Sequence, residues 1–99
     1  MEITKTQTTE KITFALSGKL DTATSPAFQE TLIPAFGEVK EIALDFADLK
    51  YVTSAGLRVL LMGEKTAKAK GATLTIANVS KEILDVFEIT GFSGILTIV

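Results

Sequence analysis

The stretch Leu49–Lys65, LKYVTSAGLRVLLMGEK, holds the change of pattern that decides the fold. From Ser54 or Ala55 to about Lys70, apolar residues recur every three or four positions, which is the spacing of an amphipathic helix. The residues before Ser54 do not keep this spacing and are interpreted as a connector that follows a strand. The stretch therefore predicts a connector, a small polar junction at Ser54, and then a helix that Gly71 ends.

One face of this predicted helix is expected to pack against a sheet. Gly56 and Gly63 lie on that face, and a glycine inside a helix costs about 1 kcal/mol relative to alanine. Their presence indicates that the helix backbone comes close to its neighbours there. Glu64 and Lys68 stand four positions apart beside the same face and are expected to form an ion pair. The whole face comprises Gly56, Leu57, Leu60, Gly63 and Ala67.

Segments on both sides of this helix alternate apolar and polar residues, which indicates strands with one buried side. Gly18 is expected to end the first of them, and residues 47–53 are the expected connector. A weaker candidate over residues 2–7 would pair with the first strand as a hairpin. The three clear strands are expected over Lys11–Ser17, Glu41–Phe46 and Ala72–Ala77, and a short one is expected over residues 95–99.

Two further helices complete the pattern. The first is predicted to begin at Pro26 behind a cap at Thr24 or Ser25, because proline suits the first turn of a helix. Pro34 is expected to kink or end it, since proline removes a backbone donor and crowds the preceding turn. The second further helix is expected to follow a cap at Ser80. The order of elements is then β-β-α-β-α-β-α-β.

This order predicts a single α/β domain over residues 1–99. Strands separated by helices indicate parallel pairs, and the opening hairpin adds an antiparallel pair, so the central sheet is mixed. Four to five strands are expected, with about three helices packed mainly on one face, because the strands carry large apolar residues on one side only. The expected core comprises Ile12, Phe14, Leu16, Phe28, Leu32, Ile42, Leu44, Leu57, Leu60, Leu74, Ile76 and Phe87.

Histidine and cysteine are absent from the 99 residues, and this excludes several kinds of site. The chain can form no Ser-His-Asp triad, no thiol nucleophile, and no zinc site with histidine or thiolate ligands. The net charge of −2 argues against nucleic-acid binding, which requires a basic surface. Apolar runs are shorter than the ~20 residues of a membrane span, and no signal peptide is recognised. We expect a cytoplasmic, non-enzymatic protein without metal, cofactor, nucleic-acid partner or membrane insertion.

Two polar residues at predicted junctions each allow a structural and a functional interpretation. Ser54 can cap the helix, its oxygen accepting a hydrogen bond from the N–H of Gly56 or Leu57. Alternatively it can carry a phosphate, which the free N–H groups and the dipole of a helix start would stabilise. Asp21 can bond its own turn, or it can form a polar rim near Ser54, because loops that leave parallel strands gather at one edge.

Two segments together resemble the STAS domain family, and in particular the bacterial anti-sigma factor antagonists. They are GKLDTATSP, residues 18–26, and LDFADLKYVTSAGLRVLL, residues 44–61. The resemblance implies a protein that binds a GHKL-type serine kinase, the anti-sigma factor, so that the sigma factor is released. It implies that this kinase phosphorylates the serine at the helix start, which breaks the complex, and that a PP2C-type phosphatase restores it.

Carried onto this chain, the resemblance assigns the phosphate acceptor to Ser54. Thr53 stands where many antagonists have aspartate, and it becomes a secondary candidate for phosphorylation. Ala55 stands where a second serine often follows, so Ser54 is the only serine at the junction. The residues that the resemblance assigns to partner binding are Asp21, Thr22, Thr24, Thr53, Ser54, Ala55, Gly56, Leu57 and Arg58.

A different function is open to the same family. The chain could be a constitutive STAS subunit of a larger assembly, such as a lipid-transporting ABC complex, and Ser54 would then only cap a helix. An enzyme or a nucleotide-binding domain lacks support, because no phosphate-binding glycine loop occurs and the carboxylates are scattered.

Overall fold

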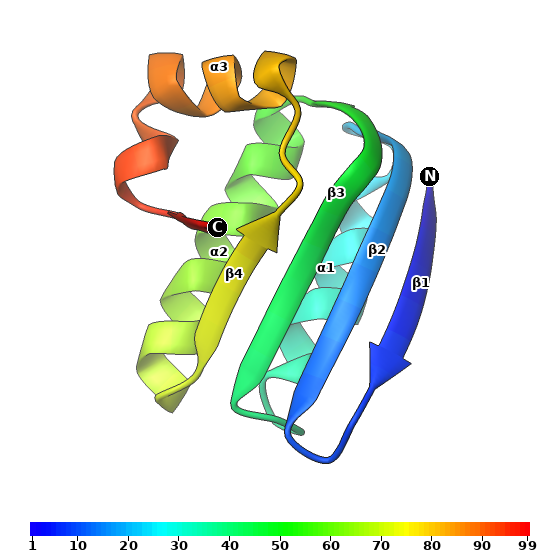
Figure 1. Ribbon diagram of the computed structural model, residues 1–99, viewed down its shortest axis with the longest axis vertical. Coiled ribbons are helices and arrows are strands. Elements are labelled where there is room, and N and C mark those ends of the chain that lie inside the picture. The colour runs from blue at the N-terminus through cyan, green and yellow to red at the C-terminus, as the bar shows by residue number, and fades with distance from the viewer.

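The computed structural model describes residues 1–99 as one sheet with its helices (Figure 1). The five strands stand in the order β1-β2-β3-β4-β5; β1 pairs with β2 antiparallel, and all other pairs are parallel. This confirms the predicted α/β fold with a mixed sheet. The elements are β1 (Glu2–Gln7), β2 (Lys11–Leu20), α1 (Ser25–Ala35), β3 (Glu41–Val52), α2 (Ser54–Lys70), β4 (Thr73–Ala77), α3 (Lys81–Thr90), a 3₁₀ turn (Phe92–Gly94) and β5 (Thr97–Ile98).

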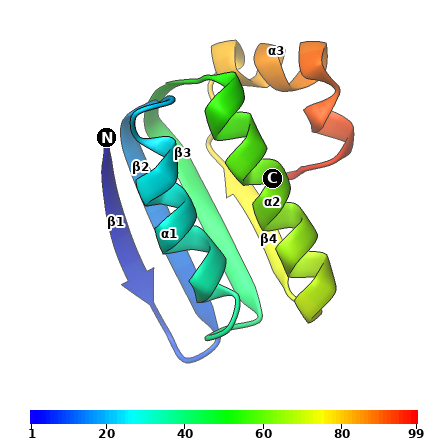
Figure 2. The same cartoon turned by 180° about the vertical axis from the view of Figure 1, so that it is seen from behind.

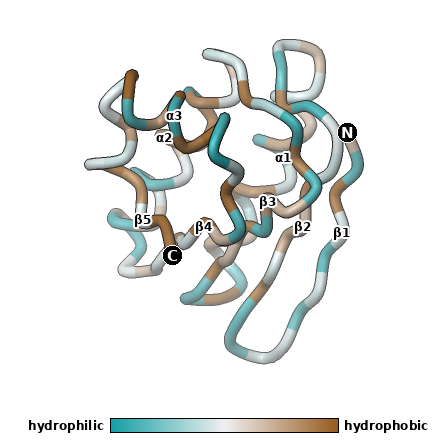
Figure 3. The backbone as a smooth tube through the Cα atoms, turned by 45° about the horizontal axis from the view of Figure 1, so that its top comes forward, coloured by the Kyte–Doolittle hydropathy of each residue, from teal (hydrophilic) through white to brown (hydrophobic).

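The helices cover one face of the sheet, as the strand pattern predicts. Helices α1 and α2 lie side by side against that face, and α3 crosses its upper end (Figure 2). The opposite face carries small or polar residues such as Thr13, Ala15 and Ala43, which are half-buried. Figure 3 shows the change of hydropathy from one residue to the next along the strands. One-sided burial of this kind is what a period of two produces.

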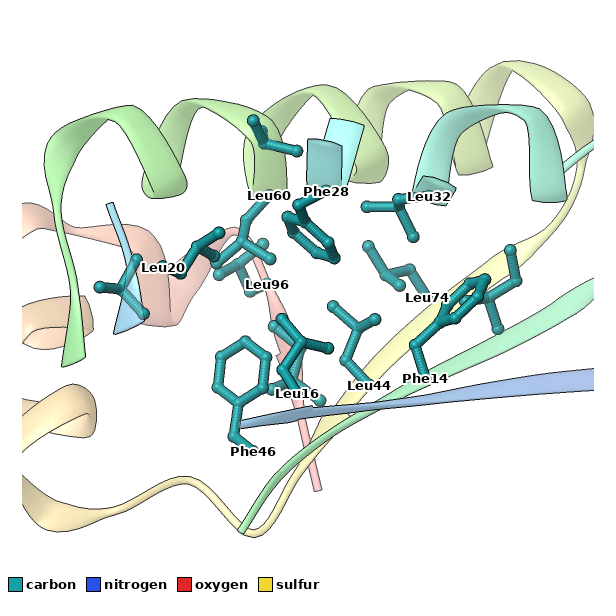
Figure 4. Packing of buried hydrophobic residues seen from close by; sticks show 14 of the residues in the cluster. Phe14, Leu16, Leu20, Phe28, Leu32, Leu44, Phe46, Leu60, Leu74 and Leu96 are labelled. Atoms are coloured by element: carbon teal, nitrogen blue, oxygen red, sulfur yellow. The ribbon is translucent and has the colours of Figure 1, made fainter. Parts of the chain in front are cut away.

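A continuous apolar core fills the space between the sheet and the helices (Figure 4). Its central row runs across three strands, because Phe14 pairs with Leu44 and Leu44 pairs with Ile76. All three side chains are at most 1% exposed. The twelve residues predicted for the core are all buried, so that prediction is confirmed.

Two strands extend further than the sequence pattern predicts. β2 continues through Gly18 to Leu20, and β3 continues to Val52, so the expected connector over residues 47–53 is mostly strand. The register between them shifts twice, and each time β3 contains one extra residue. The buried positions of β3 change there from every second to every third residue, at Phe46, Leu49 and Val52. Bulges of this kind break the alternation that identifies a strand.

Helix α1 ends one residue after Pro34, as expected, although it begins at Ser25 rather than at Pro26. Helix α2 occupies the predicted range, and Gly71 ends it in the left-handed conformation, with φ of 66°. Ser80 caps α3 as predicted, its oxygen accepting the N–H of Ile83 at 3.3 Å. Local signals therefore give the end of α2 and the cap of α3, and they place the start of α1 within one residue.

Close packing explains the two glycines of α2. A Cβ atom at Gly56 would lie 2.7 Å from Leu20 Cγ and 2.8 Å from Val52 Cγ1, which are too close for real contacts. A Cβ atom at Gly63 would lie 2.9 Å from Leu32 Cδ2 of α1. The prediction that these glycines let the helix approach its neighbours is confirmed. Gly56 matters most, because it holds the start of α2 against the ends of β2 and β3.

The predicted ion pair between Glu64 and Lys68 is wrong. Glu64 is only 7% exposed, and its Oε2 atom is buried without a hydrogen-bond partner, whereas Lys68 is exposed. The two ion pairs of the structure join Lys11 to Glu41 and Lys81 to Asp85. Glu64 lies on the buried side of α2, whereas Lys68 lies on its exposed side.

Candidate functional site

Helix α2 begins at Ser54, and the residue that caps it is Thr53. Thr53 has extended backbone angles, φ −94° and ψ 177°, and its carbonyl accepts the N–H of Leu57 at 2.9 Å. Ser54 is thus the first helical residue rather than the cap, and the predicted hydrogen bond from its oxygen to the N–H of Gly56 or Leu57 is wrong. The reason is local: a β-branched residue such as Thr53 suits the extended backbone that a cap requires.

The two hydroxyl groups at this junction have different environments. Ser54 is exposed to solvent. The Oγ1 atom of Thr53 is buried and has no hydrogen-bond partner, so it does not cap the helix with its side chain. The N–H groups of Ser54, Ala55 and Gly56 precede the first bond of the helix and have no partner within it. An exposed hydroxyl therefore stands beside free backbone donors at the positive end of a 17-residue helix.

This difference makes a prediction for Thr53. Thr53→Val should leave the free energy of unfolding unchanged or raise it by up to about 1 kcal/mol, because it removes a buried hydroxyl that makes no hydrogen bond. A true side-chain cap would lose about 0.5–2 kcal/mol on the same kind of change. Urea unfolding of the variant decides between the two. Ser80→Ala at the start of α3, where the cap bond exists, is the matched control and should lose stability.

The junction is tied to the loop that follows β2. The N–H of Thr53 donates to the carbonyl of Leu20 at 2.9 Å, and Leu20 pairs with Val52 in the sheet. The loop after Leu20 therefore leaves the sheet next to the start of α2. This places the loop of Asp21 at the same edge as Ser54, which is the position that the sequence predicted for it.

Asp21 organises this loop through its own backbone. Its Oδ1 atom accepts the N–H of Ala23 at 3.1 Å, the N–H of Thr24 at 3.1 Å and the hydroxyl of Thr24 at 3.0 Å. These hydrogen bonds hold the pKa of the Asp21 carboxyl below its ordinary value of 3.8. The N–H of Thr24 has the largest effect, and the hydroxyl of Thr24 and the N–H of Ala23 have smaller ones. Asp21 is thus ionised at neutral pH. Because its side chain bonds the turn, it shapes the loop that stands beside Ser54.

A hollow of about 250 Å³ lies between the starts of α1 and α2. Three of the residues predicted for the site line it: Thr22, Ala55 and Arg58. Arg58 is the only charged residue of the lining. Five lining residues were not predicted: Ser25, Pro26, Gln29, Val59 and Met62. Helical spacing places Ala55, Arg58, Val59 and Met62 on one side of α2, but only tertiary packing brings α1 beside them.

A second, smaller hollow of about 180 Å³ continues along α2. Its lining shares Arg58 and Met62 with the first and adds Leu61 and Lys65. Neither lining contains an acidic residue. The outward side of α2 near Ser54 is therefore apolar, with positive charge from arginine and lysine.

Two of the predicted site residues lie elsewhere. Gly56 and Leu57 are buried against the sheet, so the Gly56 backbone and the Leu57 side chain are not exposed beside Ser54. Lys19, which is not among the predicted site residues, lies at the same end of the sheet with its Nζ atom 5.5 Å from the centre of the Tyr51 ring. The sequence carries no signal for this contact, because the bulged register of β2 and β3 creates it.

The largest hollow, about 560 Å³, lies at the opposite end of the sheet, near the starts of β3 and β4. Its lining is polar and includes Glu10, Glu38, Lys40 and Glu41. None of the predicted site residues reaches it. Each helix is too short or too polar to span a lipid bilayer.

Comparisons with known proteins point to one family. A sequence model described as Mlab, STAS domain, matches residues 3–98. The chain is 29% identical over 83 residues to the anti-sigma-B factor antagonist of Bacillus subtilis, covering 84% of this chain and 76% of that protein. It is 30% identical over 97 residues to the anti-sigma-B factor antagonist of Listeria monocytogenes, covering 95% of this chain and 83% of that protein.

Solved structures agree on the fold. The anti-sigma factor antagonist SpoIIAA in its unphosphorylated form superposes with a TM-score of 0.79 at 20% identity, covering 99% of this chain and 87% of that one. The phosphorylated form of SpoIIAA from Bacillus gives a TM-score of 0.78 at 21% identity, covering 99% of this chain and 91% of that one.

Proposed function

The chain belongs to the STAS domain family, and from that premise we propose that it is an anti-sigma factor antagonist switched by phosphorylation of Ser54. In this proposal the unphosphorylated protein binds a GHKL-type serine kinase, which is the anti-sigma factor, and the sigma factor is released. The anti-sigma-B factor antagonists among its relatives support the role of antagonist. We propose that this binding and the release of the sigma factor take place in the cytoplasm.

The observation that carries the proposal is the exposed hydroxyl of Ser54 at the first position of α2. In the proposed step the Ser54 oxygen attacks the γ-phosphorus of ATP held by the kinase. The bond from that phosphorus to the β–γ bridging oxygen breaks, ADP leaves, and the hydroxyl proton passes to a base of the kinase. A PP2C-type phosphatase then directs water at the phosphorus, so that inorganic phosphate leaves and Ser54 regains its hydroxyl.

The proposed partner surface surrounds Ser54. It comprises the loop that Asp21 shapes, with Thr22 and Thr24, and the exposed side of α2 at Ala55 and Arg58. Thr53, Gly56 and Leu57 contribute by placing the backbone, because the hydroxyl of Thr53 and the side chain of Leu57 are buried. The hollow between α1 and α2 would let a side chain of the partner bind against apolar residues close to Ser54.

Phosphorylation would change the charge of this surface without unfolding it. A phosphoserine carries about −1.5 to −2 charges at neutral pH. At the start of a helix that charge is favourable for the protein itself. In an interface it must lose its water and meet the charges of the partner, which is costly. The fold therefore tolerates the phosphate, and the complex does not.

A direct experiment tests the assignment of Ser54. The protein is incubated with the candidate GHKL-type kinase and ATP, and the products are mapped by mass spectrometry. We expect a single phosphorylated species with its phosphate on Ser54. Ser54→Ala should abolish the product, whereas Thr53→Ala should only slow its formation, because the Thr53 hydroxyl is buried and Ser54 is exposed. Phosphate that persists in Ser54→Ala, or that is found chiefly on Thr53, would overturn the assignment.

A constitutive STAS subunit of a larger assembly, such as a lipid-transporting ABC complex, is the second candidate. The observation that favours it is the matching family model, which carries the description Mlab. In that case Ser54 has no chemical role, and no candidate kinase should phosphorylate it. Stable co-purification with the other subunits, unaffected by Ser54→Asp, is the result expected for this candidate.

A further inference from the structure

Arg58 stands four residues after Ser54 on helix α2. Both residues are exposed, and the guanidinium of Arg58 takes part in no ion pair and no side-chain hydrogen bond of the structure. Residues four apart on a helix are neighbours on its surface, about 5–6 Å between Cβ atoms. The mechanism proposed above places Arg58 in the partner surface and gives it no role toward the phosphate on Ser54. Because Arg58 lies close to Ser54 on the helix surface, it can interact with a phosphate on that serine.

We propose that Arg58 is the internal receptor of the Ser54 phosphate: the guanidinium pairs with the phosphoryl oxygens and is withdrawn from the hollow between α1 and α2. This inference rests on the proposed function, because it assumes a phosphate on Ser54. It adds a second event to the switch. The phosphate not only introduces negative charge but also removes the one charged group that lines that hollow.

The geometry of the helix favours this pair. Side chains of a helix lean toward its N-terminus, so Arg58 extends from its own turn back toward the turn of Ser54. An anion that precedes a cation by four residues is the better order of the two charges. The guanidinium presents several N–H donors in a flat fork, which matches two phosphate oxygens at once. Lysine would offer only a point charge at this place.

No other group of the hollow competes for Arg58. Its lining contains no carboxylate. The nearest acidic residue of α2 along the chain is Glu64, which is buried. Asp21 lies in the neighbouring loop, and its Oδ1 atom is occupied by Ala23 and Thr24. Two rival cations lie at this end of the sheet: Lys19, which lies over the ring of Tyr51, and the α-amino group of Met1, whose positive charge helps to lower the pKa of Asp21.

The test installs phosphoserine at position 54 during translation, so that no kinase is needed. A ³¹P NMR titration then gives the midpoint of the second phosphate ionisation, which is ordinarily at about pH 6. A nearby cation stabilises the doubly charged form and lowers this midpoint. We expect Arg58→Gln to raise the midpoint by about half a pH unit or more. Lys68→Gln, which removes the same charge from an exposed site farther along α2, should raise it by less than about 0.2.

Two further variants sharpen the result. Arg58→Lys keeps the charge and loses the fork, so its midpoint should lie between those of the unchanged protein and Arg58→Gln. The Nε–H resonance of Arg58 should move through the titration with the same midpoint as the phosphorus signal. Equal small shifts for Arg58→Gln and Lys68→Gln, or a larger shift for Lys19→Gln than for Arg58→Gln, would overturn the proposal. A kinase that leaves Ser54 unmodified would contradict the proposed function but not this pairing.

Discussion

Ser54→Asp is expected to weaken binding to the serine kinase by at least about 100-fold, whereas Ser54→Ala is expected to bind as tightly as the unchanged protein. The aspartate places a fixed negative charge at the centre of the proposed surface, where it loses its water in the complex. Unfavourable charge in an interface costs several kcal/mol, and each 1.4 kcal/mol is a factor of ten in Kd. Isothermal titration calorimetry with the kinase measures the difference.

The effect should be confined to binding. Ser54 is the first residue of α2, and an acid in the first turn of a helix stabilises it by about 0.3–1 kcal/mol. The thermal midpoint of Ser54→Asp should therefore stay the same or rise. Ser93→Asp is the matched control, because Ser93 is also an exposed serine but lies in the 3₁₀ turn after α3. Equal affinities of Ser54→Asp and the unchanged protein would refute the switch.

Leu60→Ala is expected to lower the free energy of unfolding by about 2–5 kcal/mol. Leu60 is fully buried and points from α2 into the apolar core (Figure 4). Its truncation removes apolar contact area and leaves a cavity between the helix and the sheet, which the surrounding side chains fill only in part. A domain of this size has about 5–15 kcal/mol in total, so the loss is a large part of its stability.

Urea unfolding of the unchanged protein and the variant measures this loss. Ile89→Ala is the control, because Ile89 is 85% exposed and its truncation should change the free energy by less than about 0.5 kcal/mol. A loss below about 1 kcal/mol for Leu60→Ala would mean that α2 packs on the sheet through a different face. That result would also misplace Ser54, since the same helix carries it.

The length of β3 shows where reading from the sequence fails. Its first half, Glu41–Phe46, alternates strictly and was predicted. For its second half the sequence predicts a connector, because the buried residues Phe46, Leu49 and Val52 are three apart. The bulges that set this spacing exist only in the pairing with β2, where Gly18 adopts a φ of 86°. The sequence of one strand does not specify its register with the neighbouring strand, so the bulges could not be predicted from β3 alone.

Some features of the candidate site could be predicted from the sequence, and others could not. The helix start at Ser54 could be read along the chain from local pattern, and the resemblance to the STAS family then made Ser54 the acceptor candidate. The role of Thr53 as the cap and the burial of its hydroxyl could not be read, since they depend on one backbone angle and on packing. The hollow beside Ser54 depends on α1, which is separated from α2 by a whole strand in the sequence.

The sequence by itself determined the class of the fold, the core residues and the range of α2, because these follow from periodicity and from local signals at helix ends. Ser54 became the proposed acceptor through the resemblance of its surroundings to the STAS family. Tertiary structure alone decided how far β2 and β3 run, that Glu64 is buried and unpaired with Lys68, and that Thr22 and Arg58 line one hollow. Those features arise where segments distant in the chain meet, and their energies depend on both partners. That is why Ser54 could be selected from the sequence, whereas the hollow beside it could be described only from the folded chain.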